Sequence, residues 1–173
     1  MLLLDAAQNP VAPPRHDKLH EASVAAIRAA LSLRDAAIVD LVRVEGGAIV
    51  YGVAVPVFAR SKGRASAGDK PIGAVYLELD ARRHLYPLVT LWPNPGATAE
   101  SILYRRDGDN VLALSPLRHA PDVSPLTQRL RADDLSLISS RTIDAAKGAV
   151  RDALDYRRVP VLAAIAPIAG TPC

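Results

Sequence analysis

The sequence lacks the residues and motifs on which covalent and metal chemistry usually depend. Its only cysteine is Cys173, the last of 173 residues, so a single chain can form neither an internal disulfide nor a cysteine-based metal site. It contains no G-x-S-x-G motif, no phosphate-binding glycine loop and no H-E-x-x-H motif. The histidines are dispersed, and His16 with His20 supplies too few ligands for a metal ion. We therefore expect a protein without catalytic residues, cofactor or metal.

Aromatic residues and long apolar runs are also scarce. Aromatics make up 4% of a chain that is 50% hydrophobic, so its cores must consist mainly of Val, Leu, Ile and Ala. The longest apolar stretch, VPVLAAIAPIAG, contains two prolines and is shorter than the roughly 20 residues that a transmembrane helix needs. The apolar opening Met1–Leu4 is followed directly by the acidic Asp5, so it is too short for the apolar region of a signal peptide.

The net charge of +3 is spread over arginine pairs that lie close to acidic residues. Proteins that bind nucleic acids usually carry a basic stripe with stacking aromatics or a reading helix. Neither feature is visible, so nucleic acid is not an expected partner.

One arrangement of strands and helix occurs twice, with the copies roughly one hundred residues apart. MLLLDAAQNPVA and ESILYRRDGDNVLAL each indicate two short strands joined by a polar turn. VDLVRVEGGAIVYGVAVPVFA and AVRDALDYRRVPVLAAIAPI each indicate a later pair of strands, and a helical stretch separates the two elements in both copies. The pattern predicts tandem modules over residues 1–89 and 90–173, joined by TLWPNPGATAE.

In the first half, alternating apolar residues predict strands at Leu2–Leu4, near Val11, at Ile38–Val44, at Ala48–Phe58 and at Ile72–Leu79. A spacing of three and four predicts a helix over Asp17–Leu31, with Asp17 as its cap. The glycines of Glu45-Gly46-Gly47 favour a tight hairpin. SKGRASAGDK, residues 61–70, is typical of a surface loop, and Asp80 is expected to cap a short helix.

In the second half, Ile102–Arg106 and Val111–Leu114 are expected to pair across a D-G-D-N turn. Broken helices are expected over Pro121–Lys147, and a closing strand pair over Ala149–Tyr156 and Val159–Ile168. No counterpart of the strand at Ile72–Leu79 follows, so we expect an excised piece whose second module lacks its last strand. The predicted class is α+β, with each module an antiparallel sheet covered by helices.

WPNPGATAESILYRRDGDNVLALSPLRHAPD, followed by DYRRVPVLAAIAPIAGTP, resembles double Cache domains, the extracytoplasmic sensor regions of bacterial membrane-bound histidine kinases and diguanylate cyclases. The resemblance is closest over Trp92–Pro172. Over Leu2–Val89 it rests on element order and on GVAVPVFA followed by PIGAVYLELD. The family's long N-terminal helix is absent from this sequence.

The resemblance implies two tandem PAS-like modules in the periplasm, with flanking membrane helices in the full-length protein. It also implies a homodimer in which a small ligand, for example a carboxylate or an amino acid, shifts the positions of helices.

Four residues are candidates for contact with a ligand. Arg118 follows the second strand of the second module and can fork onto a carboxylate, although a solvated loop beside Asp122 is the alternative. Tyr156 lies where two strands turn and can donate a hydrogen bond, although plain packing is the alternative. Tyr51 and Tyr76 lie on neighbouring strands of the first module, where one polar group among apolar walls is typical of a small-molecule pocket. Packing on a sheet face is the alternative for both.

Three classes of function remain open on this evidence. The first, which we favour, is a non-enzymatic sensor of a small ligand. The second is a dimerisation or partner-protein-binding module of the same fold with no small ligand, which the scarcity of convergent polar residues favours. The third is a small α+β enzyme, for which the sequence shows no recognisable site.

Overall fold

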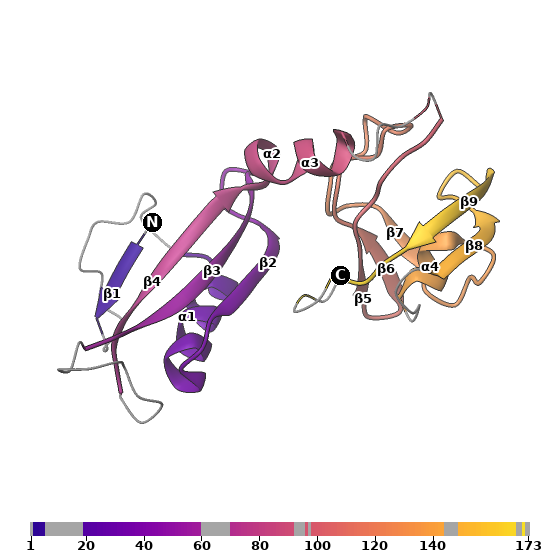
Figure 1. Ribbon diagram of the computed structural model, residues 1–173. Coiled ribbons are helices and arrows are strands. Elements are labelled where there is room, and N and C mark those ends of the chain that lie inside the picture. Colours follow the sequence, from indigo (N-terminus) through magenta and orange to yellow (C-terminus); the bar gives the residue numbers. More distant parts are fainter. Residues whose placement is uncertain are drawn as a thin grey trace. The chain divides into compact units, whose positions relative to one another are not determined.

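The computed structural model describes residues 2–5, 19–59, 70–91, 96, 98–143, 149–168 and 171. The chain divides into two compact units, Met1–Arg83 (unit 1) and His84–Cys173 (unit 2), as Figure 1 shows. Helices and three small antiparallel sheets make up these units, which confirms the predicted α+β class. The observed division follows Arg83, whereas the sequence predicts a division after residue 89.

Unit 1 is a four-stranded antiparallel sheet with one covering helix. Its elements, in chain order, are β1 (Leu2–Asp5), α1 (Glu21–Leu33), β2 (Ala37–Arg43), β3 (Ile49–Phe58) and β4 (Pro71–Asp80). The strands lie in the order β1-β4-β3-β2, so the last strand in sequence fills the place between the first and the third. Because β4 is antiparallel to both of these neighbours, β1 and β3 run in the same direction.

Local chemistry sets the ends of these elements. His20 has extended backbone angles, and its Nδ1 accepts a hydrogen bond from the N–H of Ala22 at 3.2 Å, so it caps α1. Gly46 and Gly47 have φ angles of 86° and 83°, which confirms the predicted glycine hairpin between β2 and β3. Asp80 accepts a bond from the N–H of Arg82 at 2.8 Å and caps α2 (Ala81–His84), as expected. The expected helix start with Asp17 as its cap is wrong, because α1 begins at Glu21 and its N-cap is His20. The expected strand near Val11 and residues 61–69 of the expected loop lie outside the described residues.

Small side chains let α1 approach the sheet closely. Ala26, Ile27 and Ala30 of the helix are buried against apolar residues from three strands, namely Val39, Ala54, Ala74 and Tyr76. The Tyr76 ring lies over Gly52, where an added Cβ would come within 2.9 Å of the ring and 2.5 Å of the Leu77 carbonyl oxygen. Glycine at position 52 therefore makes room for the one large aromatic side chain in this core.

Unit 2 contains two smaller sheets instead of the single sheet expected for its module. After α3 (Tyr86–Leu91), strands β5 (Tyr104–Asp107), β6 (Asn110–Ala113) and β7 (Arg129–Arg131) form one sheet in the order β5-β6-β7. The other sheet pairs β8 (Ala149–Leu154) with β9 (Pro160–Ile165), and α4 (Ile138–Thr142) precedes it. The hairpins β5-β6 and β8-β9 confirm both strand pairs predicted for this half.

The prediction of broken helices over Pro121–Lys147 is wrong for most of that segment. Residues 121–137 form turns and the strand β7, and α4 is the only helix among the described residues of Pro121–Lys147. β7 pairs with β6, with Leu130 opposite Val111. Leu130 is the one apolar residue of β7, so side-chain burial contributes little to this strand. The conformation of β7 therefore depends mainly on its main-chain hydrogen bonds to β6.

The core of unit 2 centres on β6 and the residues that follow it. Val111, Leu112, Ala113, Leu114 and Leu117 are all buried. Tyr86 of α3 packs into this core, and its hydroxyl donates a hydrogen bond of 2.9 Å to the carbonyl of Leu114. This contact fixes α3 to the segment that carries the candidate site.

Candidate ligand-binding site

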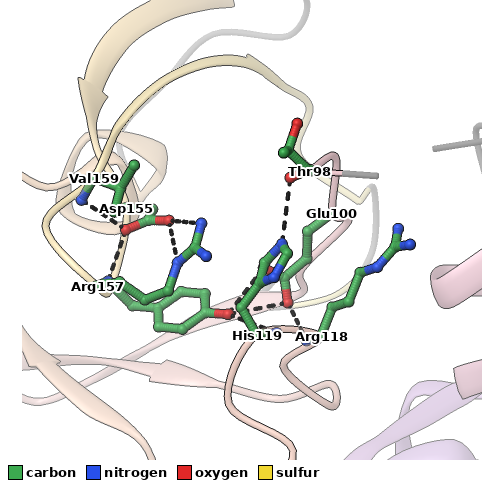
Figure 2. A network of polar contacts seen from close by, with 8 residues as sticks. Thr98, Glu100, Arg118, His119, Asp155, Arg157 and Val159 are labelled. Atoms are coloured by element: carbon green, nitrogen blue, oxygen red, sulfur yellow. Dashed lines mark hydrogen bonds and ion pairs between the residues drawn. The ribbon is translucent and has the colours of Figure 1, made fainter. Parts of the chain in front are cut away.

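Polar groups from three separate segments of unit 2 meet at one place (Figure 2). Glu100 precedes β5, Arg118 and His119 follow β6, and Tyr156 lies in the turn between β8 and β9. The Glu100 carboxylate accepts bonds from the Tyr156 hydroxyl, at 3.0 Å, and from the backbone N–H of Arg118. The Tyr156 oxygen also accepts the N–H of His119 at 3.2 Å. Two predicted site residues, Arg118 and Tyr156, are thus joined through Glu100, which the sequence analysis missed.

The Arg118 side chain lies along the segment that carries Glu100. Its Nη1 donates to the carbonyl oxygens of Ala99, at 3.0 Å, and of Gly96, at 3.4 Å. These bonds orient the guanidinium, which has five N–H donors in total. An exposed, oriented guanidinium with further donors can bind a carboxylate or carbonyl group.

A hollow of about 420 Å³ opens beside this cluster. Its lining combines apolar residues with hydroxyl and charged groups, namely Thr90, Leu91, Ala99, Glu100, Ser101, Pro116 and Arg118. Thr90, one of these lining residues, donates its hydroxyl to the Tyr86 carbonyl at 2.9 Å, so its side chain is held by α3. The volume lies in the range of small-molecule sites, and a few placed polar groups among apolar ones are typical of them.

Two tyrosines at the cluster are held in the protonated form. Burial raises the pKa of Tyr156 to about 12, and the hydrogen bond and charge of Glu100 act in the same direction. Burial also raises the pKa of Tyr104, with the charge of Glu100 as the next cause. The Tyr104 hydroxyl is buried and has no hydrogen-bond partner within the described residues. Its unused donor lies at the cluster, and the sequence analysis missed this residue.

The turn that carries Tyr156 is fixed by the buried carboxylate of Asp155. Its Oδ1 accepts the N–H groups of Arg157, at 2.7 Å, and Val159, at 3.0 Å. Its Oδ2 lies 2.8 Å from Nε and 2.6 Å from Nη2 of Arg157 (Figure 2). The guanidinium carbon of Arg157 is 5.7 Å from the centre of the Tyr156 ring. The carboxylate therefore orders both the turn and the cation beside Tyr156.

The two tyrosines predicted for the first module do not converge on a common site. Tyr76 is 1% exposed and faces α1, where its hydroxyl lies 2.9 Å from the Ser23 hydroxyl oxygen. Burial raises the pKa of Tyr76 to about 12. Tyr76 pairs with Ala54, three residues from Tyr51 on the same strand, so the alternation of side chains places Tyr51 on the opposite face. Tyr76 packs in the core of unit 1.

Within the part of the chain that the structure describes, no three His, Cys, Asp or Glu residues are grouped so that they could hold a metal ion. No helix there is both long enough and apolar enough to cross a membrane. In comparisons with known proteins, this chain matches no family model, no curated protein and no solved structure.

Proposed function

We propose that this chain is the ligand-sensing region of a bacterial membrane-bound signalling protein, with two tandem PAS-like modules of the double Cache type. The observation that carries the proposal is the meeting of Glu100, Arg118 and Tyr156 beside a hollow of about 420 Å³. All three residues belong to the strings that resemble double Cache domains. The sheet order of unit 1, with its last strand between the first and third, agrees with that architecture. An extracytoplasmic location and a homodimer belong to the same proposal.

The contacts suggest how binding changes the conformation of unit 2. A small carboxylate in the hollow is bound by the Arg118 guanidinium. Glu100 lines the same hollow and also accepts the Tyr156 hydroxyl from the turn between β8 and β9. Occupancy therefore changes the environment of a carboxylate that holds the β8-β9 hairpin. A ligand that favours one arrangement of this contact shifts the population towards it.

Removal of the Arg118 guanidinium tests the site. A thermal-shift screen of amino acids and small carboxylates on the whole chain is expected to find a compound that raises Tm. Arg118→Ala is expected to weaken its binding by at least about tenfold, because a charge-assisted bond is lost. Arg82→Ala is the matched control, because that exposed arginine of α2 lines no part of the hollow. A screen without any stabilising compound, or equal losses in both variants, would contradict the proposal.

A second candidate function is dimerisation, and the face of unit 1 opposite α1 favours it. Ile38 pairs with Val53, and Val53 pairs with Leu77, so three apolar side chains form a row across β2, β3 and β4. Ile38 is 52% exposed and Leu77 is 40% exposed. Neighbouring apolar side chains left exposed on a sheet face are typical of protein–protein contact surfaces.

Charge placed on this face tests the dimer. Leu77→Lys is expected to shift the whole chain from dimer to monomer in sedimentation velocity, because an unpaired charge is costly to bury. Leu88→Lys, at an exposed leucine of α3, controls for the change in net charge. The idea fails when the unmodified chain sediments as a monomer at all accessible concentrations.

A further inference from the structure

We propose that the Glu100 carboxylate exchanges between two tyrosine donors in unit 2, the Tyr156 hydroxyl that it accepts in this structure and the buried Tyr104 hydroxyl. In the first arrangement Glu100 ties the β8-β9 hairpin to the segment before β5. In the second arrangement its bond is local to that segment, and the hairpin loses this tie. The exchange needs no ligand, and it would supply the two arrangements between which the proposed sensor selects.

The Tyr104 hydroxyl is the polar group that this exchange would satisfy. It is buried and has no hydrogen-bond partner among the described residues. Tyr104 is paired with Ala113, which is 2% exposed, so the ladder between β5 and β6 fixes its backbone beside the core of unit 2. A hydroxyl that is buried without a partner costs about as much stability as a hydrogen bond contributes. An acceptor brought to this hydroxyl therefore stabilises unit 2.

Two carboxylates act on the Tyr104 hydroxyl, and Glu100 is the one that can accept it. Burial raises the pKa of Tyr104, and the charge of Glu100 raises it more than those of Tyr156 and Asp155. The four lone-pair positions of Asp155 are filled by two backbone N–H groups and by Nε and Nη2 of Arg157. Within the described part of the chain, Oε2 of Glu100 accepts only the Tyr156 hydroxyl. This oxygen has room for a different donor.

The bond between Tyr156 and Glu100 can be given up at low cost to both residues. The Tyr156 hydroxyl lies 3.0 Å from Oε2 and 3.4 Å from Oε1 of Glu100, and its oxygen also accepts the N–H of His119 at 3.2 Å. Oε1 of Glu100 accepts the backbone N–H of Arg118. When the donor at Oε2 changes, Tyr156 keeps His119 and Glu100 keeps Arg118. Each residue thus has a second contact that holds it near the cluster.

A double-mutant cycle on the whole chain tests the exchange, with urea denaturation reporting the unfolding equilibrium constant of unit 2. Tyr156→Phe alone is expected to raise this constant less than about threefold, because Tyr104 replaces the lost donor. In the Tyr104→Phe background the same change is expected to raise it at least about tenfold, because Glu100 then has no tyrosine donor. Tyr104→Phe alone is expected to leave the constant unchanged or to lower it, because its hydroxyl loses no partner.

Tyr86→Phe is the matched control, because the Tyr86 hydroxyl bonds to the Leu114 carbonyl and takes no part in the exchange. Its effect is expected to be the same with and without the Tyr104 hydroxyl. Equal effects of Tyr156→Phe in the two backgrounds would overturn the proposal. A loss on Tyr104→Phe as large as that on Tyr86→Phe would also overturn it, because the Tyr104 hydroxyl would then already be bonded, for example to water.

Nuclear magnetic resonance of the hydroxyl protons gives a second test. In Tyr156→Phe the Tyr104 hydroxyl proton is expected to exchange with solvent at least about tenfold more slowly than in the wild type, because a bond to the carboxylate protects it. An unchanged exchange rate would contradict the proposal. Neither test uses a ligand, so a failed ligand screen and a failed exchange between the two tyrosines are separate results.

Discussion

Asp155→Ala is expected to lower the free energy of unfolding of unit 2 by about 2–4 kcal/mol. The Asp155 side chain is 6% exposed and accepts two backbone N–H groups of the turn between β8 and β9. Alanine leaves these donors without their acceptor and leaves the Arg157 guanidinium without its carboxylate. The loss falls on the turn that positions Tyr156, so the contact between Tyr156 and Glu100 is expected to weaken as well.

Urea denaturation with a probe in unit 2 measures this effect. Asp155→Asn keeps an oxygen acceptor but loses the charge, so its loss of stability is expected to lie between those of the wild type and Asp155→Ala. Asp122→Ala removes an exposed carboxylate of the same unit and is the matched control. Equal losses for Asp155→Ala and Asp122→Ala would show that the buried carboxylate does not hold the turn.

The Asp155 carboxylate also makes the stability of unit 2 depend on pH in the acid range. Burial alone raises the pKa of Asp155, but the N–H groups of Val159 and Arg157 and the Arg157 guanidinium outweigh it, so the pKa lies below its ordinary value. Because the pKa of Asp155 is lower in the folded state than in the unfolded state, its ionised carboxylate stabilises unit 2. This stabilisation is complete above about pH 4, near the ordinary pKa of an unfolded aspartate, and is lost as the pH falls through the folded-state pKa. Asp155→Asn is expected to flatten the fall in stability on this acid side.

The sequence predicts the hairpins of this fold because their signals are local. Gly46, Gly47 and Gly108 all have positive φ angles, which glycine adopts without strain. The strand β7 has no such signal. It is preceded by Leu126, which has a φ of 64° without being glycine, and it is held by main-chain bonds such as that from Ala113 to the Gln128 carbonyl. Its conformation therefore depends on β6, which no local pattern of residues 121–137 reveals.

The residues of the candidate site also fall into those that the sequence predicts and those that become apparent only in the folded structure. Arg118 and Tyr156 could be predicted because each lies beside the end of a strand. Glu100 could not, since its partners Arg118 and Tyr156 are 18 and 56 residues away in sequence and meet it only after folding. Tyr76 is predicted from the sequence as a ligand contact but is buried in the core. The alternation of side chains places it on one face of the sheet and does not reveal that α1 covers that face. The small residues of α1, such as Ala26 and Ala30, are the signal that could have indicated close cover.

Gly52→Ala is the second change with a large expected effect, a loss of about 2–4 kcal/mol in the stability of unit 1. The added methyl group would lie 2.5 Å from the Leu77 carbonyl oxygen and 2.9 Å from the Tyr76 ring. The ring can retreat only by giving up its contact with the Ser23 hydroxyl, at 2.9 Å. The carbonyl can retreat only by distorting the pairing of β3 with β4.

A double variant separates these two costs. In chemical denaturation, Gly52→Ala is expected to cost less stability in the Tyr76→Leu background than in the wild type, but still a measurable amount. The shorter side chain relieves the contact with the ring and leaves the contact with the backbone carbonyl. Gly96→Ala is the control, since nothing described lies within 4 Å of its added Cβ. Full recovery in the double variant would mean that the sheet adapts freely and that Tyr76 alone requires glycine at position 52. A loss for Gly52→Ala no larger than that for Gly96→Ala would mean that β3 and β4 are not closely packed beneath α1.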